Sequence, residues 1–164
     1  MSTVMKSRME PRSADPPPVV QTAAMLWLTA VAFGAFETVL MVAQLLYEGT
    51  ATVAGLLPQA GIRLAVFGAA VFLALRLRRG ENWARLTLAV TLGIFGTLSL
   101  VIGPVQWLLA GGSIGAAVAG ADAMQLIFAG SRIMHVVAVL GAVTLMFQPR
   151  ANAYFKRPAR PPAP

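Results

Sequence analysis

Four ionisable side chains lie within long apolar stretches of the sequence, and they are its first candidates for chemistry. They are Glu37, Arg63, Arg132 and His135. A charge at the centre of a bilayer costs about 2.5 to 3.5 kcal/mol on insertion scales, so such residues pair with one another or serve protons and ions. These residue types therefore indicate either a structural ion pair or proton-coupled movement of a small solute.

Glu37 is central to both interpretations, because no other acidic residue lies deep within an apolar segment. An unpaired carboxylate there would take up a proton or approach Arg63 or Arg132. At 1.5 Å per residue, Glu37 should lie about 15 Å and Arg63 about 9 Å from the ends of their helices. A long arginine side chain can close much of that gap. We expect an ion pair or hydrogen bond inside a bundle, with a proton-carrying Glu37 as the alternative.

An enzymatic function has little support in the sequence. Arg132 lies one helical turn before His135 and disfavours a second positive charge, so a packed, hydrogen-bonded histidine is favoured over a catalytic one. No GxSxG, HExxH or phosphate-loop motif is present. With no cysteine and one histidine, a thiolate or His-rich metal site is excluded. We expect no enzyme, no cofactor and no metal.

The composition indicates that lipid surrounds these residues. Of 164 residues, 57% are hydrophobic and 12% charged, and the mean hydropathy is +0.72, whereas soluble domains are about 45 to 50% apolar. Four apolar segments reach the roughly 20 residues that a membrane-spanning helix needs, and none alternates as barrel strands do. The sequence predicts an all-α, polytopic membrane protein. Its four transmembrane helices are expected at residues 21–47, 57–77, 83–109 and 123–147.

The ends of the chain are predicted to be tails. Residues 1–20 are rich in proline and are expected to be disordered, and residues 148–164 form a basic, proline-rich tail. The first apolar segment is too long for the core of a secretory signal and contains Glu37, so we expect a retained helix.

Basic residues predict the orientation. All but two of the 13 lie in the two tails or the connection between the second and third helices. The other connections, Glu48–Gly55 and Gly111–Asp122, contain no lysine or arginine. Because short cytoplasmic loops retain positive charge, we expect a multi-pass protein of the plasma (inner) membrane with cytoplasmic N- and C-termini.

The second connection is the most basic one. It holds Arg76, Arg78, Arg79, Gly80, Trp83 and Arg85. Gly80 is expected to relieve the backbone after the second helix, Asn82 to cap the third, and Trp83 to lie at the membrane interface. Topology is the favoured role. Binding of anionic lipid head groups, at about 1 kcal/mol per basic residue, is the alternative. Nucleic acid is not an expected partner, because the basic residues are scattered over brief segments.

Two further patterns concern helix packing. Gly34–Thr38 is similar to Gly93–Thr97, and Ala60–Arg63 is similar to Ala129–Arg132, which leaves open either two parallel-repeat hairpins or chance. Small residues predict the seams between helices, since close approach is what holds helices together in lipid. The expected seam residues are Gly61, Ala65, Gly68 and Ala69 in the second helix, and Gly130, Ala138, Gly141 and Ala142 in the fourth. A homodimer interface is the alternative.

The turn sequence RRGENWARL resembles that of small, mostly uncharacterised bacterial four-span membrane proteins, which share an R-x-G-x-x-W-A-R inner turn. The matching positions are Arg78, Gly80, Trp83, Ala84 and Arg85. This resemblance covers the middle third of the chain and implies a four-span architecture without a known activity. The glutamate midway along the first helix is similar to that of small multidrug-resistance transporters, but the rest of that pattern is missing.

Together these features favour a non-enzymatic accessory or assembly component, which packs against the lipid bilayer and against itself or a larger membrane complex. The alternative is a small-solute or proton-coupled transporter that uses Glu37 and the intramembrane arginines. The accessory role leads because polar groups within the helices are few and only Pro104 is expected to kink a helix.

Overall fold

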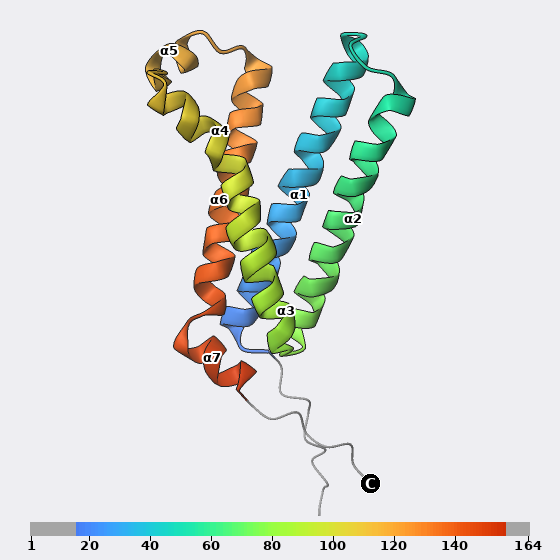
Figure 1. Cartoon of the computed structure of the whole chain (residues 1–164). Helices are drawn as coiled ribbons and strands as arrows, with labels where there is room; N and C mark the ends of the chain where they lie inside the picture. Colours follow the sequence, from blue (N-terminus) through green and yellow to red (C-terminus); the bar gives the residue numbers. More distant parts are fainter. Residues whose placement is uncertain (1–15, 157–164) are drawn as a thin grey trace, which may run out of the picture.

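A computed structural model describes residues 16–156, which form helices and contain no strands (Figure 1). Four helical spans are long and apolar enough to cross a membrane: α1 (Pro18–Tyr47), α2 (Val53–Arg78), a composite third span (Asn82–Leu109) and α6 (Ala123–Met146). The all-α, four-span prediction is confirmed. The chain is a multi-pass membrane protein.

The third span is made of three segments, which the sequence did not predict. It begins as α3 (Asn82–Thr87), continues as the π-helix η1 (Leu88–Gly96) and ends as α4 (Thr97–Leu109). Pro104 lies inside α4, where it removes a backbone donor and favours a kink. Figure 1 shows the end of α4 turned away from α1 and α2. The loop that follows contains the short helix α5 (Ile114–Ala119).

Both predicted tails extend beyond the described residues. Residues 1–15 and 157–164 lie outside them, so disorder there stays a prediction. The predicted boundaries need correction, since Pro18–Val20 already belong to α1 and Pro149–Phe155 form a helix, α7. Proline suits the first turn of both helices because its missing N–H would be unbonded there anyway.

The buried core lies toward the end of the bundle that carries Pro18, the Arg78–Asn82 turn and α7. We call this the terminal end and the opposite one the far end. Helices α1, α2 and α6 meet through small residues: Ala23, Ala24 and Ala30 of α1, Ala70 and Ala74 of α2, and Ala138 and Ala142 of α6. Trp27 fills the space between them and donates from Nε1 to the Met146 sulfur at 3.4 Å. Short side chains thus allow the close approach that lipid-embedded helices need.

The seam predicted for α2 is wrong. Gly61, Ala65, Gly68 and Ala69 are all exposed on the bundle surface. The inward face of α2 carries Arg63, Ala70 and Leu77 instead. Arg63 bonds to α1 and so turns its own face inward, because an intramembrane cation seeks a polar partner. On α6, Ala138 and Ala142 are buried as expected, but Gly130 is exposed.

Candidate functional site

Five polar side chains from three helices meet in the far half of the bundle. They are Glu37 and Thr38 of α1, Arg63 of α2, and Ser131 and Arg132 of α6, and we call them the polar layer. Because α2 begins at Val53, earlier than expected, Arg63 lies about 15 Å from the end of its helix rather than 9 Å. Glu37 lies at a similar depth, near the middle of a hydrocarbon core about 30 Å thick.

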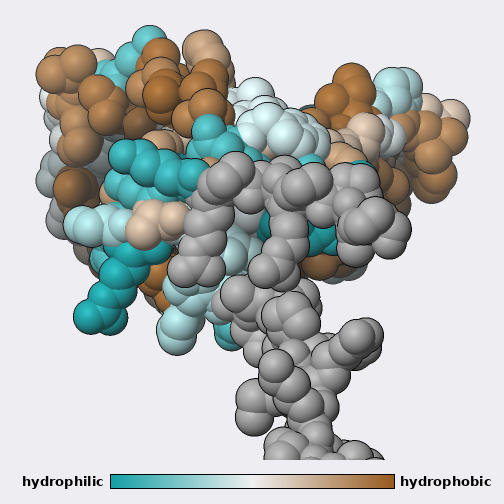
Figure 2. All heavy atoms as spheres, turned by 90° about the horizontal axis from the view of Figure 1, so that it is seen from below, coloured by the Kyte–Doolittle hydropathy of each residue, from teal (hydrophilic) through white to brown (hydrophobic). Residues whose placement is uncertain are grey.

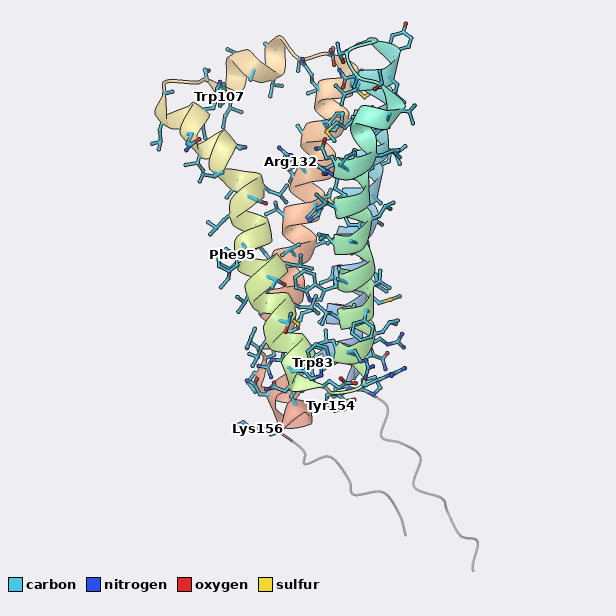
Figure 3. The ribbon with its side chains drawn as sticks, turned by 45° about the vertical axis from the view of Figure 1, so that its right-hand side comes forward. Trp83, Phe95, Trp107, Arg132, Tyr154 and Lys156 are labelled. Atoms are coloured by element: carbon cyan, nitrogen blue, oxygen red, sulfur yellow. The ribbon has the colours of Figure 1, made fainter. Side chains whose placement is uncertain are left out.

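Glu37 is buried and contacts α6 through both carboxylate oxygens. Ser131 Oγ donates to Oε1 at 3.2 Å, and Nε of Arg132 lies 3.9 Å from Oε2. Figure 3 shows the Arg132 side chain leaving α6 toward α1 and α2. Of the two arginines expected as partners, Arg132 is therefore the one next to Glu37.

Arg63 has a neutral partner instead. Its Nη1 donates to Thr38 Oγ1 at 3.3 Å, and that hydroxyl donates to the Gly34 carbonyl at 2.7 Å. Among the described residues, Arg63 forms no ion pair. The polar layer thus holds two guanidinium groups and one carboxylate, so it carries a net positive charge.

His135 packs one helical turn nearer the terminal end than Arg132. A Cβ at Gly34 would lie 3.3 Å from His135 Cε1 and 3.0 Å from Phe67 Cε1, so glycine lets the two rings approach α1. Within residues 16–156, the buried Nδ1 of His135 has no hydrogen-bond partner. The packed histidine expected from the sequence is present, and its Nδ1 takes no part in the hydrogen bonding that was also expected.

A cavity of about 170 Å³ lies next to His135 and reaches all four spans. Trp27 and Ala30 of α1, Val66 and Phe67 of α2, and Leu92 and Ser99 of the third span lie along its walls. The walls are mainly apolar. The site therefore joins a cationic polar layer to a small apolar chamber within the membrane-spanning part.

The turn between α2 and α3 forms a separate polar cluster at the terminal end. Glu81 accepts from Arg76 Nη1 at 2.9 Å and from Trp83 Nε1 at 2.7 Å. The hydrogen bond from Arg76, assisted by that from Trp83, lowers the pKa of Glu81 below its ordinary value of 4.5. Glu81, not Asn82, occupies the N-cap position of α3, and its side chain makes no capping bond. The cap predicted at Asn82 is thus wrong.

Gly80 adopts the left-handed conformation expected of it, with φ of 81°. The Tyr154 ring packs on this glycine, and its hydroxyl donates to the Arg78 carbonyl at 3.0 Å. Arg78 and Arg79 are exposed. Figure 2 views this end of the bundle and shows hydrophilic residues gathered left of centre and reaching the lower left edge, with hydrophobic residues at the upper left and on the right.

Arg85 has a structural position that the sequence did not predict. It is 7% exposed, and its guanidinium lies over the rings of Phe147 at 4.2 Å and Phe155 at 5.0 Å. Its Nη2 donates to Asn152, whose amide in turn donates to the Phe147 carbonyl at 3.0 Å. Arg85 thus fastens α7 to the third span, beyond any part in topology.

Sequence reasoning missed the neutral members of these clusters, Thr38, Ser131 and Asn152. Their side chains are common in such helices and carry no charge to attract notice, and only the contacts identify them. Within the described residues, no three histidine, aspartate or glutamate side chains gather as a metal site would require.

Comparison of the chain with protein-family models, curated proteins and solved structures gives no significant match. Its function is therefore inferred from the geometry of its own residues.

Proposed function

We propose that this membrane protein is a non-enzymatic accessory or assembly component that packs against another transmembrane helix through α2. One observation carries the proposal: the small residues Gly61, Ala65, Gly68 and Ala69, which we call the α2 face, are turned outward. A Cβ added at Gly61 or Gly68 would meet nothing within 4 Å. A smooth helix face lets a second backbone approach closely, and van der Waals packing of this kind drives helix association in lipid.

The partner is a second copy of the chain or a helix of a larger membrane complex. Because the chain has no cysteine, a single Ala65→Cys substitution reports contact between copies by disulfide formation in native membranes. Val39→Cys is a matched control, since Val39 is a small apolar residue on α1 with 66% of its surface exposed. We expect a cross-linked dimer from Ala65→Cys and none from Val39→Cys.

If the partner is a helix of a larger membrane complex, the evidence comes from co-purification and not from cross-linking between copies. In that case a Gly61→Leu, Gly68→Leu double variant loses co-purifying membrane proteins, whereas Val39→Leu retains them. Equal cross-linking at Ala65 and Val39, together with unchanged co-purification of the double variant, would contradict the α2 face as an interface.

We further propose that the protein resides in the plasma (inner) membrane with both termini cytoplasmic. The support is charge asymmetry: outside the polar layer, the basic residues of the described chain lie at the terminal end. They are Arg76, Arg78, Arg79, Arg85, Arg150 and Lys156. The exposed members of this set are also placed to contact anionic lipid head groups.

A proton-coupled or small-solute transporter is the second candidate, because the polar layer adjoins a chamber reached by all four spans. Glu37→Gln separates the two functions. A structural Glu37 predicts that the variant loses about 1.5 to 3 kcal/mol of stability, as is typical for hydrogen bonds to charged groups. A transporting Glu37 predicts unchanged thermal stability in detergent and loss of a proton-coupled flux in vesicles. Glu48→Gln is the control, since Glu48 is exposed at the end of α1.

A further inference from the structure

A groove of about 350 Å³ lies between α4 and α6. Leu100, Val101 and Pro104 line it from α4, and Ile133, Val136 and Val137 from α6. Arg132 also lines the groove. The groove is thus open and mainly apolar, with one charged residue in its lining, and its volume is typical of small-molecule sites, which occupy about 300 to 1,000 Å³.

The net positive charge of the polar layer favours binding of an anion. Glu37 is the one carboxylate near Arg63 and Arg132 among the described residues, and the Arg132 contact with it uses only Nε. The Arg132 side chain remains 49% exposed. Its terminal nitrogens make no hydrogen bond within residues 16–156. A guanidinium so placed can form two parallel hydrogen bonds to a carboxylate or phosphate.

Arg132 lies so deep in the membrane that an anion must enter the hydrocarbon core to bind it. Arg132 lies about 14 Å from the start of α6, near the middle of the hydrocarbon core. Phosphates in their ordinary place at the membrane surface are too far away for an arginine side chain to reach. An anion that binds here must therefore carry an apolar part into the bilayer.

The groove favours an acyl chain over a protein helix as that apolar part. Both of its walls belong to this chain, and a helix with its side chains is about 10 Å across. We propose that the groove between α4 and α6 binds a single-chain amphiphile whose anionic head, a carboxylate or a phosphate, pairs with Arg132. This site uses other helices than the α2 face and does not depend on it.

The test measures binding of radiolabelled palmitate to the full chain in nanodiscs of neutral phosphatidylcholine. We expect saturable binding of one palmitate per chain. Hexadecanol, which has the same chain and no charge, should compete at least tenfold more weakly, and acetate, which has no chain, should not compete. Lysophosphatidate identifies a phosphate head if it displaces palmitate, and a carboxylate preference if it does not.

Two pairs of variants locate the site. Arg132→Gln should weaken the saturable binding of palmitate at least tenfold. Arg79→Gln, an exposed arginine at the terminal end that can contact head groups at the membrane surface, should leave the saturable binding of one palmitate per chain unchanged. Val137→Phe fills the groove without touching the polar layer and should also weaken binding tenfold, while Val39→Phe on the surface of α1 should not. Equal binding of hexadecanol and palmitate, or full binding by Val137→Phe, would overturn the proposal. Loss of a co-purifying membrane protein from Arg132→Gln, without any palmitate binding to the wild type, would assign the anion to a partner helix instead and would also overturn it.

Discussion

Gly80 shows how much one residue contributes to the terminal end. Both Gly80 and Gly49 have positive φ, at 81° and 67°, so an alanine at either costs about 1 to 2 kcal/mol in the backbone. Only at Gly80 would the new Cβ also meet a neighbour, the Tyr154 ring at 3.0 Å. We predict that Gly80→Ala loses about 1 to 3 kcal/mol more stability than Gly49→Ala, a cost typical of overpacking.

Thermal unfolding in detergent measures this difference directly. A Gly80→Ala, Tyr154→Ala double variant removes the clash, so it should lose less than the sum of the two single variants. Equal unfolding temperatures for Gly80→Ala and Gly49→Ala would show that the Tyr154 ring moves aside without loss of stability, which would contradict the prediction.

Glu81 predicts a pH-dependent change in the turn. Its pKa is lowered in the folded chain, so its bonds to Arg76 and Trp83 stabilise the turn above the unfolded pKa and are lost as pH falls through the folded value. We predict that NMR of a Glu81 carboxyl label gives a pKa below 4.5 and that Arg76→Gln raises it. An unchanged pKa in Arg76→Gln would contradict the hydrogen bond as the main cause.

The polar layer marks what residue types alone can predict. A carboxylate and two arginines in apolar segments are recognised from the sequence as functional or paired residues, because burying charge is costly. Which arginine approaches Glu37 depends on the rotation of α2 and α6 about their axes. A change of one residue in the start of α2 shifts the expected depth of Arg63 by about 1.5 Å. The sequence could therefore name Arg63 and Arg132 as candidate partners but could not choose between them.

At the scale of elements, the Asn152 side-chain amide is one of the contacts that hold α7 against the bundle. Asn152 accepts from Arg85 and donates to the Phe147 carbonyl, so Asn152→Ala leaves a buried guanidinium short of a partner. We predict a loss of about 1 to 3 kcal/mol and earlier proteolysis after α6. Arg150→Ala, an exposed change on the same helix, should alter neither. Unchanged protease resistance of Asn152→Ala would show that the aromatic contacts hold α7 alone.

The elements differ in how well their sequences predict them. The four apolar spans emerged because membrane thickness sets their length. Helix α7 was not predicted, since a seven-residue helix has a weak sequence pattern of its own. It forms against Arg85 and Gly80. The π-helix η1 was not predicted either, because π-helical bonding changes the backbone of a uniformly apolar segment without changing its hydropathy. The α2 face was misplaced for a related reason: small residues permit contact on either side of a helix.

At the scale of the whole molecule, charge asymmetry predicts the orientation. A reporter active only in the cytoplasm should be active when fused after Arg79 and after Pro164, and silent after Gly112. An alkaline phosphatase, active only outside the cytoplasm, should give the opposite pattern at the same three positions. A cytoplasmic reporter that is silent after Arg79 would reverse the proposed orientation.

The contact between Arg85 and α7 also sets an order of events during synthesis. Asn152 follows Arg85 by 67 residues, which a ribosome making about 5 to 20 residues per second completes in roughly 3 to 13 s. For that interval the newly made third span carries its arginine without Asn152 or Phe155. The terminal end closes only when α7 leaves the ribosome, so a chain that stops after α6 retains all four spans but lacks the contacts of Arg85 with Asn152 and Phe155. In a cell that degrades unfinished membrane proteins, an Arg85 without its α7 contacts would distinguish a truncated chain from one that includes α7.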